Sequence, residues 1–380
     1  MVDYKAAGVN IELGDEASDI LYNAAKHTWG NRDGRVGEIY SPFDDFSGLR
    51  CVRVGGLPDD AVMSFGFDGV GTKVELAERT GNHETVAYDL FAMVCDDAVV
   101  RGGEPALVGS ILDVRSLGSD DAPYTGFLKQ LAKGYIEAAS DANVAVINGE
   151  IAELGARIGG RGDFNYNWGA GCVWFAREGR LFRGNEPREG DSIVALKEDG
   201  PRSNGLSLFR KILTDRYGPD WDAAPECEGY ADAMLRPSKI YTRAVVDMIG
   251  GFDSEPKAQV HGVAHITGGG IPGKVGRMLK ATGLGAYFDY VFSPCQIMLD
   301  MQEMGEVPDH KAYRTWNMGQ GMAIATPEPE NVIELAGSHG IVAKVAGEVT
   351  KGPGITVRSA GRFSEGKELP FDLEGNFLGD

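Results

Sequence analysis

Short apolar runs of strand length alternate with amphipathic helical segments along most of this chain, and that alternation restricts the fold more than any other feature of the sequence. Residues 15–27 carry apolar side chains at helical spacing, with Asp15 as the expected N-cap. Residues 61–67, AVMSFGF, predict a short buried strand, and residues 72–79 predict a helix that ends at Gly81. The alternation indicates a mixed α/β fold.

The same pattern continues to residue 351. Residues 260–279 read as a strand, a glycine turn and a helix. Further strands are predicted over residues 106–114, 144–148, 167–178, 192–197, 319–327 and 342–351. Further helices are predicted from residue 85 to the glycines at 102 and 103, and over residues 124–142, 206–217, 238–251 and 331–340.

A chain of 380 residues is longer than one hydrophobic core usually organises, so two domains are expected. Residues 179–190 combine glycine, proline and charged side chains without an apolar period, which is typical of a linker. We therefore expect an N-terminal domain over residues 1–178 and a C-terminal domain over residues 191–358. Residues 359–380 are polar and acidic, and they are predicted to be peripheral.

The net charge of −19 argues against general binding to nucleic acid or to an anionic membrane. No apolar run reaches the roughly 18 residues that a membrane span needs, and the polar N-terminus does not resemble a signal peptide, so a cytoplasmic protein is expected. The five cysteines are scattered and never form a C-x-x-C pair, which argues against a disulfide framework or a structural zinc site.

The stretch SFGFDGVGTK, residues 64–73, resembles a phosphate-binding loop only in part. Gly66 and Gly71 have the spacing of the P-loop glycines, but Thr72 and Lys73 follow in the reverse order. Asp68 lies inside the loop, where its carboxylate would repel a phosphate unless a cation lay between them. The combination suggests a phosphate site that works through a metal ion.

Acidic residues mark two further places. Asp89 and Asp96 lie about 20° apart on a helical wheel, with Asp97 one position further round. Glu150 and Glu153 follow an apolar run, at the strand end where α/β proteins place functional groups. Such acids could hold magnesium at nucleotide phosphates, but helical acids also line solvated edges, and the spacing leaves both readings open.

Two polar turns occupy the second half. The turn HITGGGIPGK, from His265 to Lys274, follows an apolar strand and precedes a helix, so its backbone N–H groups could face an anion. The loop PRSNG offers Arg202, a hydroxyl, an amide and a glycine before a helix, which suits a phosphate or a sugar. Either turn could also be purely structural.

Taken together, these motifs resemble one family, aminoimidazole ribonucleotide synthetase, also called phosphoribosylformylglycinamidine cyclo-ligase. The resemblance runs from residue 4 to about residue 357 in collinear order. The segments that carry it are DGVGTK (68–73), DLFAM (89–93), GGEP (102–105), SNGLSLFRKIL (203–213), AHITGGG (264–270) and YRTWNMGQGM (313–322).

The resemblance implies a two-domain fold in which the N-terminal sheet forms a dimer-spanning β-barrel, so a homodimer is expected. It implies an ATP-dependent ring closure of formylglycinamidine ribonucleotide to aminoimidazole ribonucleotide, with Mg²⁺ and release of ADP and phosphate. A phosphoribosyl substrate and ATP would be the partners. Catalysis would rest on positioning and on charge stabilisation by magnesium and lysine.

Individual residues acquire expected roles by the same resemblance. The catalytic candidates are Asp68, Lys73, Asp97 and His265, and either His265 or Asp97 could move the proton. The metal candidates are Asp68, Asp97 and Glu150. The nucleotide and phosphate candidates are Gly69, Gly71, Thr72, Asp89 and Gly149. The substrate candidates are Arg202, Ser203, Asn204, Gly205, Thr267, Gly268, Gly269 and Gly270.

Several positions depart from the family pattern. Tyr22 aligns with an expected lysine, Arg202 with an expected histidine, and Asn148 and Ile151 with a glycine and a hydroxyl residue. The glycine-rich loop of the family appears as SPFDDFSG, residues 41–48. These departures leave two alternatives open: a paralogous synthetase or small-molecule kinase of the same superfamily, and a nucleotide-binding relative without activity.

Overall fold

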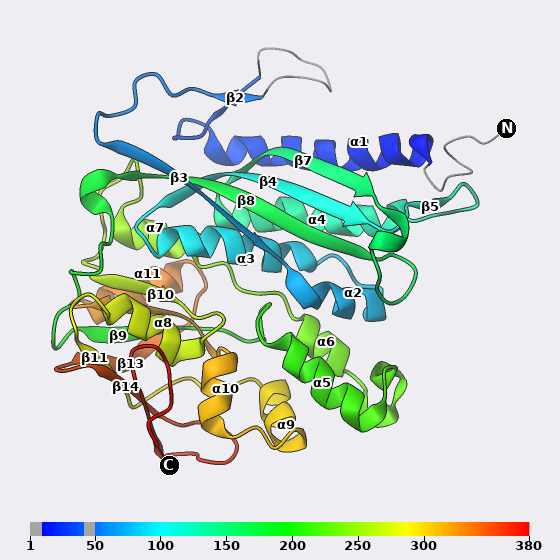
Figure 1. The fold of residues 1–380 in the computed structure, drawn as a ribbon. Coiled ribbons are helices and arrows are strands. Elements are labelled where there is room, and N and C mark those ends of the chain that lie inside the picture. Colours follow the sequence, from blue (N-terminus) through cyan, green and yellow to red (C-terminus); the bar gives the residue numbers. More distant parts are fainter. Residues whose placement is uncertain (1–9, 42–49, 380) are drawn as a thin grey trace. The chain divides into compact units, whose positions relative to one another are not determined.

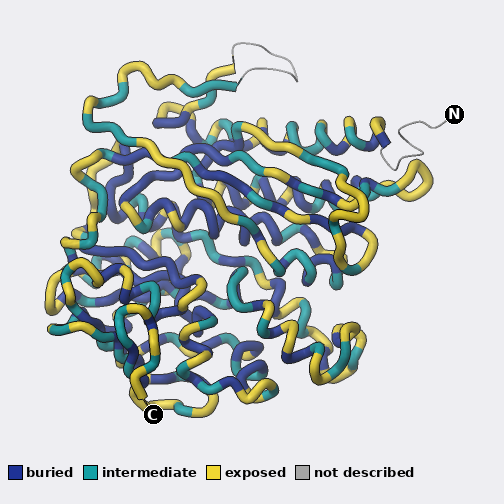
Figure 2. Tube along the Cα trace, in the orientation of Figure 1, coloured by how far each residue is buried: buried dark blue, intermediate teal, exposed yellow. Residues whose placement is uncertain are grey.

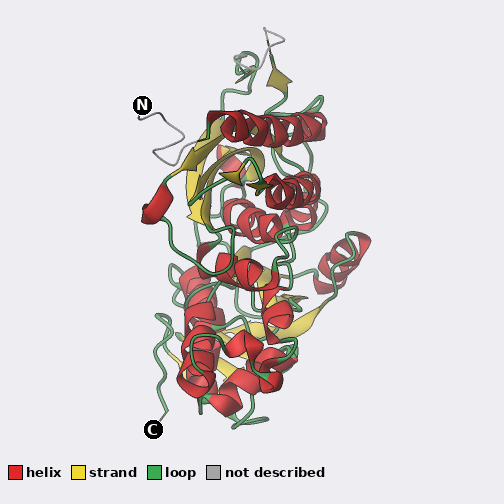
Figure 3. Ribbon diagram, turned by 90° about the vertical axis from the view of Figure 1, so that its right-hand side faces the viewer, coloured by secondary structure: helices red, strands yellow, loops and turns green. Residues whose placement is uncertain are grey.

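The computed structural model describes residues 10–41 and 50–379, and they divide into two compact units. Unit 1 comprises Met1–Ala98 and Glu104–Gly179, and unit 2 comprises Val99–Gly103 and Arg180–Asp380. Both units combine helices with strands, so the predicted mixed α/β class is confirmed (Figures 1 and 3). Residues 42–49, which include most of the altered SPFDDFSG segment, lie outside the described residues.

Unit 1 contains an open four-stranded sheet in the order β3-β8-β4-β7. Its strands are β3 (Ala61–Gly69), β8 (Tyr166–Arg177), β4 (Glu104–Val114) and β7 (Ala145–Glu153). Strands β4 and β7 run parallel, as expected for strands joined by a crossover helix, and the other neighbours are antiparallel. The dimer-spanning barrel therefore stays a prediction, since the sheet in the described part of this chain is not closed.

Helices cover one face of this sheet. They are α1 (Ile11–Thr28), α2 (Val74–Thr80), α3 (Val86–Val99) and α4 (Thr125–Ala142). Phe91 of α3 contacts Tyr135 of α4 edge to face, and Tyr135 in turn packs on Trp168 of β8. Helix α1 lies along α4 and β7. Helix α2 ends at Gly81 in the left-handed conformation, as predicted.

The other face of the sheet is apolar and exposed in this chain. The prediction that residues 61–67 form a buried strand was wrong, because the strand forms but Met63, Phe65 and Phe67 are 62%, 51% and 76% exposed. Figure 2 shows β3 as exposed along most of its length. The two phenylalanine rings lie over Gly171, where a Cβ atom would come within 2.6 Å of Phe65. Ile111 of β4 is also exposed.

Unit 2 contains a seven-stranded mixed sheet in the order β10-β12-β9-β13-β11-β14-β15. The strands are β9 (Ser192–Lys197), β10 (Gly262–His265), β11 (Gly285–Phe288), β12 (Gln320–Thr326), β13 (Ala343–Thr350), β14 (Gly354–Arg358) and β15 (Glu368–Phe371). The main helices are α5 (Leu206–Tyr217), α7 (Thr242–Ile249), α8 (Gly270–Leu279), α9 (Gln296–Met304), α10 (Asp309–Thr315) and α11 (Pro329–Ser338). Every residue of β12 is buried, so this strand lies inside the core of unit 2.

The C-terminal segment, predicted to be peripheral, adds an edge strand to this sheet and contributes buried side chains. Strand β15 pairs with β14, and Phe371 is buried. The Asp309 carboxylate accepts hydrogen bonds from Ser359 Oγ and from the backbone N–H groups of Phe363 and Ser364. The segment is rich in charge, yet its few apolar side chains and this buried carboxylate attach it to the sheet.

No helix in the described part of the chain is long and apolar enough to span a membrane. All five cysteines are free thiols, and Cys95, Cys172 and Cys227 are buried.

Candidate functional site

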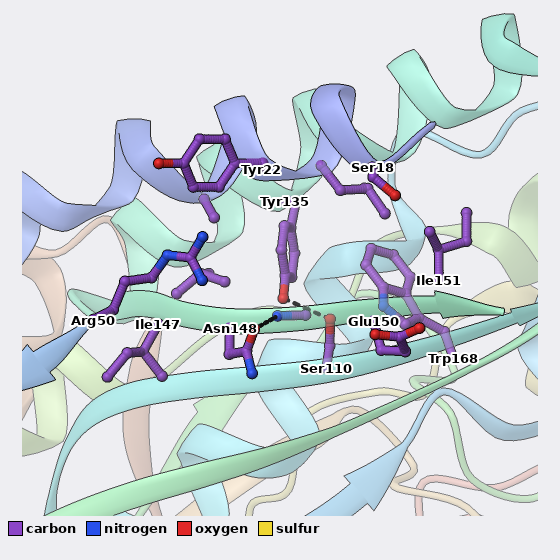
Figure 4. A pocket seen from close by; sticks show the side chains of 14 residues that line it. Ser18, Tyr22, Arg50, Ser110, Tyr135, Ile147, Asn148, Glu150, Ile151 and Trp168 are labelled. Carbon is purple, nitrogen blue, oxygen red and sulfur yellow. Dashed lines mark hydrogen bonds between the residues drawn. The ribbon is translucent and has the colours of Figure 1, made fainter. Parts of the chain in front are cut away.

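A pocket of about 290 Å³ lies in unit 1 between α1 and the sheet (Figure 4). Helix α1 supplies its upper wall, while β7, β4, β8 and α4 supply the floor and the back. Tyr22 and Ser18 come from α1, and Asn148 and Glu150 come from β7 (Figure 4). The remaining lining residues are Leu21, Ala25, Arg50, Ser110, Tyr135, Val146, Ile147, Gly149, Ile151 and Trp168.

The deep end of the pocket carries a hydroxyl pair. Ser110 Oγ and Tyr135 Oη are 2.7 Å apart. Burial raises the pKa of Tyr135 well above its ordinary value, so the phenol stays protonated and can donate to a neighbour. Together with the indole of Trp168, these groups make a pocket with flat apolar walls and a few polar atoms, as small-molecule sites usually have.

The mouth of the pocket carries a cation on an aromatic ring. The Arg50 guanidinium lies 4.8 Å from the centre of the Tyr22 ring, which also contacts Trp29 edge to face. The sequence marked Tyr22 as a departure from the family but gave no sign of Arg50, because only the folded chain places residue 50 beside α1. Ser110 and Tyr135 were missed for the same reason.

Glu150 lies within a strand and not after one. Strand β7 continues to Glu153, so the expectation that both glutamates follow the strand end was wrong. Glu150 is exposed and lines the pocket beside Gly149, whose N–H donates to Asn148 Oδ1. Glu153 accepts a hydrogen bond from the backbone N–H of Leu117. Polar residues extend the strand here because the outer sheet face is open to solvent.

The two charged residues of the glycine loop differ in exposure: Asp68 is exposed and Lys73 is buried. Asp68 is exposed at the end of β3, where its Oδ1 accepts the N–H of Gly69. Gly71 has a φ of +67°, and the short 3-10 turn Gly71–Lys73 leads into α2. Lys73 points inward and is fully buried, so Thr72 and the loop glycines are the parts of this turn nearest to solvent.

Lys73 forms a buried ion pair with Asp89 of α3. Its Nζ lies 2.7 Å from Asp89 Oδ1, and both side chains have no exposed surface. On the same helix Asp96 is buried, whereas Asp97 is exposed. The three helical aspartates therefore face different environments, and only Asp97 of the three is open to a ligand in this chain.

Two of the three metal candidates, Asp68 and Glu150, line one depression, and Asp97 is not among its lining residues. Asp68 and Glu150 both line a cavity of about 740 Å³ on the outer sheet face. The register places Asp68 opposite Ala170, Ala170 opposite Ser110, and Ser110 opposite Gly149. Three strand spacings separate β3 from β7, or about 14 Å. In the described part of the chain, no group of three or more His, Cys, Asp or Glu residues could hold a metal ion.

The two polar turns of unit 2 come together. Arg202 Nη2 lies 2.7 Å from His265 Nε2, and Asn204 Oδ1 lies 3.6 Å from the position that a Cβ atom on Gly268 would take. Thr267 is buried, and Gly268 and Gly269 are exposed at the N-terminus of α8. Ser203 and Gly205 are half-buried at the start of α5.

Glycine is required at the two ends of this arrangement. Gly205 has a φ of +77°, and a Cβ there would lie 2.4 Å from Trp316 Cδ1. Gly270 has a φ of +60°, and a Cβ there would lie 1.8 Å from the carbonyl oxygen of Tyr313. Helix α10 and the residue after it therefore hold both turns in place. The segment that begins at Tyr313 and the two turns, which all carry the family resemblance, are therefore in direct contact in the fold.

The comparisons with known proteins agree with this architecture. Residues 50–170 match the family described as AIR synthase related protein, N-terminal domain, and residues 188–359 match the family described as its C-terminal domain. The chain thus has the paired domains of AIR synthase related proteins.

A curated relative covers both domains. The phosphoribosylformylglycinamidine cyclo-ligase of Thermococcus kodakarensis is 30% identical over 363 residues, which cover 95% of this chain and 99% of that protein. The chain belongs to the phosphoribosylformylglycinamidine cyclo-ligase family.

Solved structures share the fold at lower identity. Thiamine-monophosphate kinase from Stenotrophomonas maltophilia has a TM-score of 0.55 at 14% identity, covering 92% of this chain and 97% of that chain. T. maritima PurL complexed with AMPPCP has a TM-score of 0.51 at 15% identity, covering 94% of this chain and 51% of that chain. At these identities the likeness concerns the fold alone.

Proposed function

We propose that this chain closes the imidazole ring of aminoimidazole ribonucleotide from formylglycinamidine ribonucleotide, using ATP and releasing ADP and phosphate. The observation that carries the proposal is the collinear match to a cyclo-ligase over 95% of this chain and 99% of the relative. Both domains take part in that match, so neither half of the catalytic fold is missing.

The chemistry needs ATP because a formyl oxygen is a poor leaving group. The oxygen attacks the γ-phosphorus and ADP departs, which leaves the oxygen as part of a phosphate ester. A substrate nitrogen then attacks the same carbon, the carbon–oxygen bond breaks, and phosphate leaves with that oxygen. Such a reaction depends on positioning and on charge stabilisation more than on covalent chemistry by the protein.

The pocket under α1 suits the nucleoside part of ATP. Its aromatic walls can stack a base, and the Ser110 and Tyr135 hydroxyls can bond to ring nitrogens or to ribose. The T. maritima PurL structure, which shares this fold, was solved with AMPPCP, a non-hydrolysable ATP analogue. We assign the triphosphate to the Gly149–Glu150 end, because these residues line both the pocket and the outer depression.

Mg²⁺ would be held at Asp68 or at Glu150 of the outer depression, since about 14 Å separates their strands in one chain. Asp68 and Glu150 present exposed carboxylate oxygens, the donor type that Mg²⁺ prefers. Magnesium there would neutralise phosphate charge as the γ-phosphoryl group is transferred. Asp97 is a further exposed acid on α3. The buried Lys73–Asp89 pair would fix the helix that carries Asp97 and the loop that carries Asp68.

A homodimer would bring the separated acids closer to a complete site. The outer sheet face is apolar and exposed at Met63, Phe65, Phe67 and Ile111, which is unusual for a monomer surface. A second copy placed on this face would cover these side chains. It would also bring its own β3 or β7 edge near Asp68 or Glu150, which lie about 14 Å apart in one chain.

The joined turns of unit 2 suit the phosphoribosyl substrate. Gly268 and Gly269 leave the N-terminus of the ten-residue helix α8 open, where backbone N–H groups can face a phosphate. Ser203 and Asn204 add a hydroxyl and an amide beside that turn. His265 lies at the base of the same turn and is the candidate for proton transfer in this unit.

The test is a two-product assay on the purified full chain. The chain is incubated with formylglycinamidine ribonucleotide, ATP and Mg²⁺, and aminoimidazole ribonucleotide and ADP are followed together. We expect equal amounts of both, loss of both in excess chelator, and loss of both in Asp68→Asn. ADP formed without the imidazole product would contradict the proposal and favour a kinase of the same fold.

A further inference from the structure

A buried chain of three polar side chains links the two turns of unit 2. Glu198 at the end of β9 accepts from Arg202 Nη1 at 2.8 Å, and Arg202 Nη2 lies 2.7 Å from His265 Nε2. Arg202 and His265 are 1% and 2% exposed, and Glu198 is as deeply buried. The residue expected from the family to be histidine is thus an arginine that faces inward.

The hydrogen bond between Arg202 and His265 has only one possible direction. A guanidinium group has five N–H donors and no acceptor, and it is always charged in proteins. At 2.7 Å the imidazole Nε2 must therefore accept, since a protonated Nε2 would oppose one donor with another. The histidine then carries its single ring proton on Nδ1.

Arg202 is itself held from several sides. Its Nη1 also donates to the carbonyl oxygen of Lys239, and its guanidinium lies 5.4 Å from the centre of the Tyr241 ring. Glu198, which accepts the hydrogen bond from Arg202, also accepts hydrogen bonds from the Tyr241 hydroxyl and from the backbone N–H of Lys239. The arginine adopts a φ of +60°, a conformation that costs energy for any residue with a Cβ. The surrounding bonds evidently outweigh that cost.

We propose that Arg202 is a positioning residue that fixes His265 as the neutral tautomer protonated at Nδ1. Arg202 is buried and bonded to protein groups, so it does not face a ligand as a substrate residue would. The tautomer leaves Nδ1–H as the only ring donor of His265 and fixes the ring plane at the base of the glycine turn. Only the catalytic consequence rests on the proposed function; the tautomer does not.

The direct test is ¹⁵N NMR of the histidine side chains in the full chain at neutral pH. The sequence has six histidines, and a His265→Gln variant identifies the signals of His265. We expect its Nε2 to resonate as an unprotonated nitrogen and its Nδ1 as a protonated one. A proton on Nε2, or on both nitrogens, would overturn the proposal.

A pair of variants isolates the role of Arg202. In Arg202→Met we expect the fixed tautomer to be lost and His265 to show a mixture, with kcat falling more than tenfold and KM changing little. Lys239→Met is the matched control, because it removes a nearby cation that bonds Asp199 and not His265. It should leave the His265 signals unchanged. Unchanged His265 signals in Arg202→Met would also overturn the proposal.

The two hypotheses fail in distinguishable ways. If the chain makes no aminoimidazole ribonucleotide but His265 carries its proton on Nδ1, the proposed function fails and the positioning role stands. If aminoimidazole ribonucleotide forms but His265 does not carry its proton on Nδ1, the proposed function stands and the positioning role of Arg202 fails.

Discussion

The two sheets of this molecule differ in how completely their own chain covers them. In unit 2 every residue of β12 is buried, and even the charged C-terminal segment adds a paired strand. In unit 1 helices cover one sheet face, while the other face leaves Phe65 and Phe67 exposed. A complete sheet stabilises its own unit, whereas an apolar face left open indicates a surface that binds something else.

The glycine turns of the two units also differ in how tightly the surrounding chain packs on them. A Gly→Ala substitution in the tighter turn is expected to have the largest effect on stability. Gly270 of unit 2 has a φ of +60° and no room for a Cβ, which would lie 1.8 Å from the Tyr313 carbonyl oxygen. We expect Gly270→Ala to lower the free energy of unfolding by more than about 4 kcal/mol, because backbone atoms must move. Chemical denaturation of the purified variant measures it.

Gly71 of unit 1 is the matched control. Its φ is +67°, but nothing lies within 4 Å of the Cβ position. Gly71→Ala should cost only about 1–2 kcal/mol, the strain of the left-handed conformation. If Gly71→Ala and Gly270→Ala lowered the free energy of unfolding equally, the two turns would not differ in packing as described.

The buried ion pair of Lys73 and Asp89 in unit 1 gives the next effect. Lys73→Met leaves the Asp89 carboxylate buried without its ion pair, which should destabilise the protein by about 3–5 kcal/mol. Thermal and urea unfolding measure the loss. The exposed pair of Lys211 and Asp215 provides the control, and Lys211→Met should change stability by less than about 0.5 kcal/mol.

A double variant separates the charge from the packing. Lys73→Met combined with Asp89→Leu removes both charges, and it should recover much of the stability lost in the single variant. No recovery would show that Lys73 acts through its aliphatic packing and not through the ion pair.

The open sheet face predicts self-association. Phe67→Glu should weaken the proposed homodimer at least about 100-fold, equivalent to about 2.7 kcal/mol, because it would place a charge in the proposed apolar contact. Sedimentation over a concentration series measures it. Val342→Glu, at an exposed apolar residue of unit 2, should leave the dimer unchanged. A wild-type chain that stays monomeric at all concentrations would refute the assignment of this face.

The smallest expected effect is the pH dependence that Glu78 of unit 1 gives to the free energy of unfolding. Burial raises the pKa of Glu78 from 4.5 to about 7, although the backbone N–H groups of Arg161 and Tyr166 donate to its carboxylate. Between those values the folded state binds more protons than the unfolded state, so this group's contribution to stability falls as the pH rises. Above pH 7 the contribution is lost.

The measurement compares wild type with Glu78→Gln across pH 4.5 to 8. The wild type should lose about 1–2 kcal/mol relative to the variant over this window, a loss limited by solvent screening. The comparison is needed because burial lowers the pKa of His83 to about 4, which opposes the trend in both proteins. Parallel stability curves would show that Glu78 does not titrate in the fold as described.

The sequence predicted a helix or strand well where the spacing of apolar residues within the segment itself determines which side chains are buried. Strand β9 and helix α5 have the predicted bounds, because an apolar run and a helical period end there at polar residues. Strand β7 was cut short because polar residues on an uncovered sheet face look like a loop. Strand β15 was missed because its burial comes from pairing with β14, which its own short sequence does not show.

The site was predictable in its residue types more than in its contacts. Motifs marked Asp68, Glu150 and His265 as candidates, but which groups face a ligand is a tertiary property. Nothing local shows that Lys73 points inward or that Arg202 bonds to His265. Arg50 and Tyr135 entered the pocket from segments that carry no motif.

The most direct test of the central claim follows one oxygen atom. Formylglycinamidine ribonucleotide labelled with ¹⁸O in the formyl group is incubated with the chain, ATP and Mg²⁺, and the released phosphate is analysed by mass spectrometry. Phosphorylation of the formyl oxygen predicts one ¹⁸O atom in each phosphate formed with aminoimidazole ribonucleotide. Unlabelled phosphate, with the label released as water, would contradict the proposed role of ATP.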